Sequence, residues 1–126
     1  MEIHAAKNHK CTVFAYEFIG TALLLYAINM QNGFGFGVFG IAFTIFICLL
    51  IGGPITGAHY NPAVSFGVYL CDHHWREDVV MFLVMMAAQF CGAFFGVFMV
   101  WLSFYNSNVN GNPTWANVPA AEILYL

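Results

Sequence analysis

The sequence predicts an all-α integral membrane protein with three transmembrane helices and one re-entrant half-helix. The composition is 61% hydrophobic and only 7% charged, with a mean hydropathy of +0.75, which lies outside the range of soluble domains. A turn-rich stretch from Gly53 then leads into an Asn-Pro pair and a short apolar run. The 126 residues have room for three or at most four spans and none for a soluble catalytic domain.

The first span is predicted at about Thr12–Gln31, after a polar segment at residues 1–11 that has no apolar core and is no signal peptide. It holds one ionisable residue, Glu17. A carboxylate inside a membrane helix faces protein or water rather than lipid. A proton relay is the alternative role for Glu17, but no second carboxylate follows along the span.

The second span is predicted at about Val38–Ile51. It follows a Gly/Phe alternation at 32–37 that suits a turn at the membrane interface, and it carries no charge. Gly52, Gly53 and Pro54 are expected to break the helix and return the chain into the membrane as a loop.

The half-helix is predicted to begin at Pro62, because Asn61 is a good N-cap and proline is tolerated at the first helical position. Its apolar run, through Leu70, is about a third of the ~20 residues that cross a bilayer. A helix that ends inside the membrane is tolerated only where that end is buried in protein or lines a watery cavity. Its partial positive charge favours oxygen lone pairs and repels cations. A purely structural plug is the alternative.

The polar cluster at 71–78 is expected to be an interfacial loop with Trp75 at headgroup level. Zinc binding by Asp72, His73 and His74 is the alternative, but adjacent residues rarely converge on one metal.

The third span is predicted at about Val79–Phe104. Gly92 and Gly96 are spaced to let another helix approach closely. Gln89 is the strongly polar side chain that this span would bury.

The remaining residues exclude several functions. With only three basic residues, a nucleic-acid partner is not expected. The sequence offers neither a nucleophile beside a base nor a pair of carboxylates, so neither an enzyme nor a cofactor is expected. Cysteines are not spaced as metal ligands, so Cys48 and Cys91 are predicted to be small core residues. His59 is interpreted as a hydrogen-bonding loop residue rather than a metal ligand.

The basic residues also predict orientation. Lys7, Lys10 and Arg76 would lie on one side of the membrane, which the positive-inside rule makes the cytoplasmic side or its organellar equivalent. With three predicted spans, the chain is expected to be a multi-pass membrane protein. The plasma membrane and an organellar membrane, such as the mitochondrial inner membrane, both fit.

Three motifs carry a family resemblance. GAHYNPAV at 57–64 resembles the first signature loop of the major intrinsic protein family, the aquaporins and aquaglyceroporins. EFIGT at 17–21 resembles the first-helix pattern of that family, and AQFCGA at 88–93 resembles its third-helix pattern. The resemblance covers about the first 105 residues.

The resemblance implies an aquaporin-like half. Members of the family are usually inverted repeats of two three-span halves, each with one half-helix. Residues 12–104 would form the first half, with its signature loop at 53–70. Residues 105–126 would be a polar connector followed by the start of a second repeat.

The resemblance also implies roles for individual residues. The pore and signature loop would comprise Gly57, Ala58, His59, Tyr60, Asn61, Pro62 and Ala63. The Asn61 amide would donate hydrogen bonds to a passing solute, and the carbonyls of 57–60 would accept them. Glu17 and Gln89 would support the loop. Ile41, twenty positions before Asn61, would be a selectivity-filter residue. Its aliphatic side chain would make the constriction more apolar, which favours glycerol or another small neutral solute.

The expected function is that of a channel half, a passive route for water or small neutral solutes when paired with a second half. Expected partners are membrane lipids and a separately encoded second half, a second copy, or subunits of a larger complex. The alternative is a non-transporting structural or accessory subunit of a larger membrane complex, such as a respiratory or other organellar assembly. The 14 phenylalanines fit that alternative because they pack against neighbouring helices.

Overall fold

The fold was analysed in a computed structural model that describes residues 9–34, 37–71 and 75–106. The described chain forms helices and no strand. In order, the helices are α1 (Lys10–Phe34), α2 (Gly37–Thr56), α3 (Pro62–Cys71) and α4 (Trp75–Asn106). Three of them contain stretches long and apolar enough to cross a membrane, whereas α3 has only 10 residues. The predicted fold class is confirmed.

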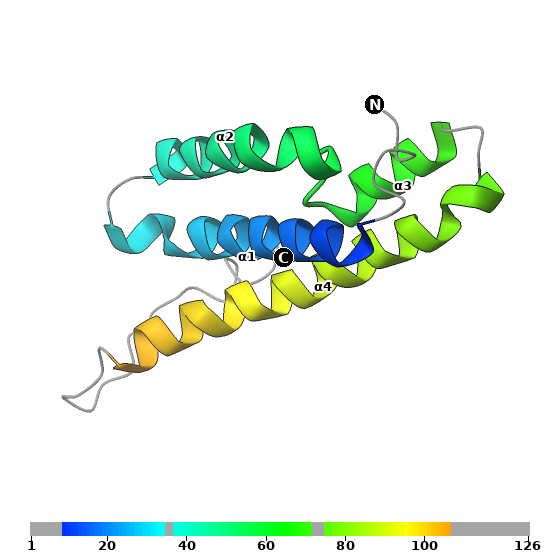
Figure 1. Cartoon of the computed structure of the whole chain (residues 1–126). Helices are drawn as coiled ribbons and strands as arrows, with labels where there is room; N and C mark the ends of the chain where they lie inside the picture. Colours follow the sequence, from blue (N-terminus) through cyan, green and yellow to red (C-terminus); the bar gives the residue numbers. More distant parts are fainter. Residues whose placement is uncertain (1–8, 35–36, 72–74, 107–126) are drawn as a thin grey trace.

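The helices are arranged around α1 (Figure 1). Helix α2 runs antiparallel to α1 along one side of it, and α4 packs along the other. After α2 the chain crosses a short loop, and α3 then packs against the first part of α4. The loop therefore lies where α1, α2, α3 and α4 come together.

Helices α1 and α4 approach closely because two glycines of α4 face the backbone of α1. A Cβ atom on Gly92 would collide with the carbonyl oxygen of Phe18, and one on Gly96 would collide with that of Ala22. The close helix contact that the spacing of Gly92 and Gly96 predicts is therefore made with α1 of the same chain.

Helix α3 is held by aromatic and aliphatic contacts with α4. The rings of Tyr69 and Phe82 stack with centroids 4.6 Å apart. The preceding residue, Val68, packs on a buried cluster of Val13, Met81 and Met85, which joins α3 to α1 and α4. A helix of this length is marginal alone, so these contacts stabilise it.

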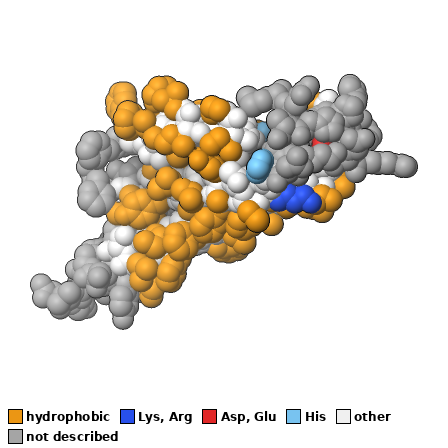
Figure 2. Space-filling model, in the orientation of Figure 1, with side chains coloured by type: hydrophobic (Ala, Val, Ile, Leu, Met, Phe, Trp, Pro, Cys, Tyr) orange, Lys and Arg blue, Asp and Glu red, His pale blue; other side chains and the backbone are white. Residues whose placement is uncertain are grey.

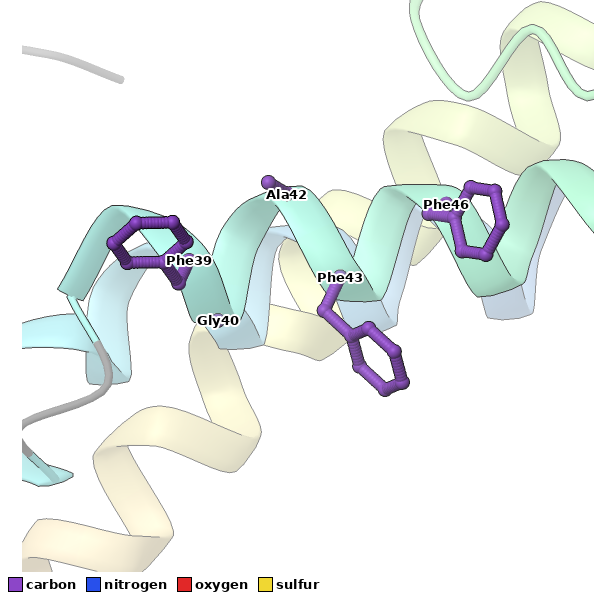
Figure 3. Close-up of a pocket in the computed structure, with 5 residues that line it drawn as sticks. All are labelled: Phe39, Gly40, Ala42, Phe43 and Phe46. Carbon is purple, nitrogen blue, oxygen red and sulfur yellow. The ribbon is translucent and has the colours of Figure 1, made fainter.

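The face seen in Figure 2 is largely apolar over the described helices. Helix α2 is the most exposed span, with 11% of its most apolar window buried against 28% for α1 and 33% for α4. Figure 3 shows a shallow hollow on α2 lined by Phe39, Gly40, Ala42, Phe43 and Phe46. These residues come from the first half of α2, away from the loop that follows it. Such a surface suits contact with lipid chains.

The predicted helix break at Gly52, Gly53 and Pro54 is wrong, because α2 continues through them to Thr56. Proline fixes φ near its helical value, and so close to the end of a helix it removes a single backbone hydrogen bond. The Gly57 N–H still donates to the Gly53 carbonyl at 3.1 Å, which completes the last turn.

Other boundaries also differ from the predictions. Helix α1 extends to Phe34, and α4 begins at Trp75 within the predicted interfacial loop. Cys48 is buried as predicted, but the prediction that Cys91 is a core residue is wrong, because its side chain is exposed. Residues 1–8 and 72–74 lie outside the described residues. Of the connector and repeat start predicted at 105–126, residues 107–126 also lie outside them, whereas Tyr105 and Asn106 belong to α4.

Gly92→Ala should lower the free energy of unfolding by about 1–3 kcal/mol, because the new methyl group forces α1 away from α4. Gly67→Ala on α3 is the matched control, since a Cβ there has nothing within 4 Å. Thermal unfolding of the purified protein in detergent measures both. Equal melting temperatures for the two variants would contradict the close helix contact.

Candidate functional site

The loop between α2 and α3 has an unusual backbone. Gly57 has φ 85°, and two non-glycine residues are also left-handed, Ala58 at φ 52° and Tyr60 at φ 47°. Such conformations cost about 1–3 kcal/mol each and persist only where the surroundings hold them. The contacts of the loop must therefore supply that restraint.

The carboxylate of Glu17 supplies most of the restraint. The side chain is fully buried. Its Oε1 accepts hydrogen bonds from the Thr56 hydroxyl at 2.6 Å and the His59 N–H at 3.1 Å. Its Oε2 accepts from the Tyr60 N–H and from Gln89 Nε2, both at 2.8 Å. One carboxylate thus joins α1 to the end of α2, to the loop and to α4.

A second set of contacts surrounds this carboxylate. Gln89 Nε2 also donates to the Ser65 hydroxyl at 2.8 Å, and His59 Nδ1 lies 3.1 Å from the same oxygen. The Ala58 N–H donates to the Thr56 hydroxyl at 3.0 Å. The loop backbone, α3 and α4 are therefore linked by side chains that are all at least partly buried.

The start of α3 agrees with the sequence prediction. Asn61 Oδ1 accepts a hydrogen bond from the Ala63 N–H at 2.8 Å, and the Asn61 carbonyl accepts one from the Ser65 N–H at 3.0 Å. Asn61 is exposed. Because its side-chain oxygen is used in the cap, the Nδ2 group of Asn61 is left as a donor on this exposed side chain.

The carbonyl groups of the loop accept no hydrogen bond from the described residues. Within the described part of the chain, no hydrogen bond reaches the carbonyl oxygens of residues 57–60. These acceptors and the Asn61 amide belong to the loop that leads into the positive end of the α3 dipole. This arrangement suits a small neutral molecule that both donates and accepts hydrogen bonds.

The other predicted site residues lie as follows. Tyr60 turns its side chain away from the loop, and its hydroxyl donates to the Cys48 carbonyl at 2.8 Å. Ile41 is half-buried in the first part of α2, apart from the loop. Among the loop residues, Ala58 is buried, Gly57, His59 and Pro62 are half-buried, and Ala63 is exposed.

No group of three or more potential ligands that could hold a metal occurs among the described residues. The alternative zinc site at Asp72, His73 and His74 lies outside them.

Sequence reasoning missed two residues of the site, Thr56 and Ser65. Each is a small polar residue at the edge of, or inside, an apolar helix. A hydroxyl in such a place needs a hydrogen-bond partner, because burying it unpaired is unfavourable. This need for a partner could have marked Thr56 and Ser65 as site residues, but it could not identify Glu17 and Gln89 as their partners.

Comparisons with known proteins show the family of the chain. The family profile described as Major intrinsic protein matches residues 11–124. The aquaglyceroporin of Toxoplasma gondii is 32% identical, over 78% of this chain and 37% of its own length. A probable aquaporin PIP2-5 of Arabidopsis thaliana is 36% identical, over 67% and 35% respectively. A glycerol uptake facilitator protein of Buchnera aphidicola is 26% identical, over 72% and 37%.

The chain therefore spans about a third of the length of these relatives. No solved structure matches it. The matches confirm the resemblance drawn from the three sequence motifs.

Glu17→Ala should lower the free energy of unfolding by at least about 1–3 kcal/mol, because it leaves buried donors of the loop unpaired. Glu17→Gln should also destabilise the protein, since its NH₂ group would face other donors. The measurement is thermal unfolding in detergent, with Leu23→Ala on the exposed side of α1 as control. A Glu17→Ala protein as stable as the control would show that the carboxylate does not hold the loop.

Proposed function

The chain belongs to the major intrinsic protein family, and we propose that it forms one half of a channel for water or small neutral solutes. The observation that carries the proposal is the exposed amide of Asn61. Its oxygen caps α3, so its Nδ2 hydrogens are directed at whatever passes the loop. Relatives named as aquaporins and glycerol facilitators support a channel rather than an enzyme.

In the proposed mechanism, a passing water or polyol oxygen accepts a hydrogen bond from Asn61 Nδ2. The solute in turn donates its hydroxyl hydrogens to the carbonyls of residues 57–60, which have no other donor in the described chain. These contacts replace bulk hydration without binding tightly, so the solute can move on. The positive end of α3 raises the barrier to cations.

The proposal requires a second half. The described residues supply one helix N-terminus at membrane depth, and the exposed Asn61 lies at that end. Exposure of this end to lipid is unfavourable, because the Asn61 Nδ2 group and the loop carbonyls would have no hydrogen-bond partner there. We therefore propose that a second half-helix, on whichever chain carries it, covers this end and completes the pore.

We further propose that Ile41 contributes to the selectivity of the completed pore. It is half-buried on α2, and its aliphatic side chain would make a constriction less polar. The relatives include both an aquaporin and a glycerol facilitator, so the proposed solute class is water together with small polyols.

Asn61→Asp separates transport from folding. Aspartate is as good an N-cap as asparagine, so the free energy of unfolding should stay near that of the wild type. The variant loses the amide donor and places a negative charge at the pore, so water flux should fall and cation leak should rise. Asn61→Ala should lose flux and also about 1 kcal/mol of stability from the cap.

The assay is stopped-flow shrinkage of liposomes that contain the protein purified with its native partner. The wild type should exceed empty liposomes in water or glycerol flux, and both variants should fall below the wild type at equal protein content. A flux that neither variant changes would contradict the pore mechanism.

A further inference from the structure

The side chain of Tyr60 lies away from the proposed solute path. It is 5% exposed and reaches back between α1 and α2, where its hydroxyl donates to the Cys48 carbonyl at 2.8 Å. With Cys48 and Ala58 it forms a separate buried cluster. Tyr60 directly precedes Asn61, so its placement bears on the amide donor.

Two glycines form the slot that holds this ring. A Cβ atom on Gly20 of α1 would overlap the ring carbons of Tyr60, whereas one on Gly52 of α2 would overlap the hydroxyl oxygen. The ring therefore fits only because neither helix carries a side chain there. Gly53, the next residue of α2, faces open space instead.

The two ends of Tyr60 are fixed independently. Its N–H donates to Glu17 Oε2 at 2.8 Å, while its hydroxyl is fixed on α2. Between them the backbone has φ 47°, a conformation that an aromatic residue rarely adopts. Asn61 on the other side is held by the Ala63 and Ser65 N–H groups, which donate to its Oδ1 and its carbonyl. Because both residues are held, the peptide group between Tyr60 and Asn61 cannot turn freely.

We propose that Tyr60 is a positioning residue for the channel. Its side chain, seated between Gly20 and Gly52, sets the orientation of the peptide that joins it to Asn61. It thereby aims both the Tyr60 carbonyl and the Asn61 amide at the solute path. The effect on transport rests on the proposed function, whereas the effect on loop geometry does not.

A pair of coupled substitutions tests this inference. Gly52→Ala should displace the hydroxyl of Tyr60 and lower the water permeability per molecule. Tyr60→Phe removes the atom that the new methyl group meets, so the double variant should recover most of that loss. Gly20→Ala meets the ring carbons instead, so Tyr60→Phe should not rescue it. Gly53→Ala is the matched control.

Two readouts are taken on the full chain in lipid, together with its native partner. The first is water permeability per folded molecule. The second is amide hydrogen exchange at Tyr60 and Ala63, whose N–H groups are bonded to Glu17 and Asn61. Exchange at both should accelerate in Gly52→Ala and return toward the wild type in the double variant.

The outcomes separate the two proposals. If Gly52→Ala lowers only the melting temperature, with exchange and permeability per folded molecule unchanged, Tyr60 is merely structural and the inference is overturned. The same holds if Tyr60→Phe fails to rescue Gly52→Ala. If the wild type itself does not conduct, the proposed function fails, while hydrogen exchange still decides the role of Tyr60.

Discussion

The structure depends on one buried carboxylate. Glu17 has no exposed surface, and it accepts hydrogen bonds from the end of α2, from two loop amides and from α4. A charge or polar group buried in this way is tolerated only when hydrogen bonds satisfy it. Because the donors come from separate elements, satisfying the carboxylate fixes the relative positions of those elements. The left-handed loop backbone at Ala58 and Tyr60 follows from that fixed frame.

The loop in turn determines what the site offers to a solute. The same amide group of Asn61 caps α3 with its oxygen and presents its nitrogen outward. The backbone carbonyls nearby have no donor in the described chain. We propose that Tyr60, seated between Gly20 and Gly52, holds these groups in place. A rigid row of this kind can exchange hydrogen bonds with a neutral molecule without rearranging.

The helix start at Asn61-Pro62 and the three spans were predictable from the sequence because they depend on local chemistry. Asn61-Pro62 specifies a capped helix start, and the apolar runs specify three spans. The end of α2 was not predictable from Gly52, Gly53 and Pro54, since the bonding of the last turn decides whether a proline ends a helix. The partners of Glu17 were also hidden, because Thr56 and Gln89 lie 39 and 72 residues away in the sequence. Only the fold brings them together.

The central claim is that a solute passes this loop in hydrogen-bonded contact with it. Its most direct test is the temperature dependence of water flux through liposomes that hold the natively purified protein. A flux well above that of empty liposomes, with the shallow temperature dependence of movement through a pore, is the predicted result. Flux equal to that of empty liposomes, with their steep temperature dependence, would contradict the account.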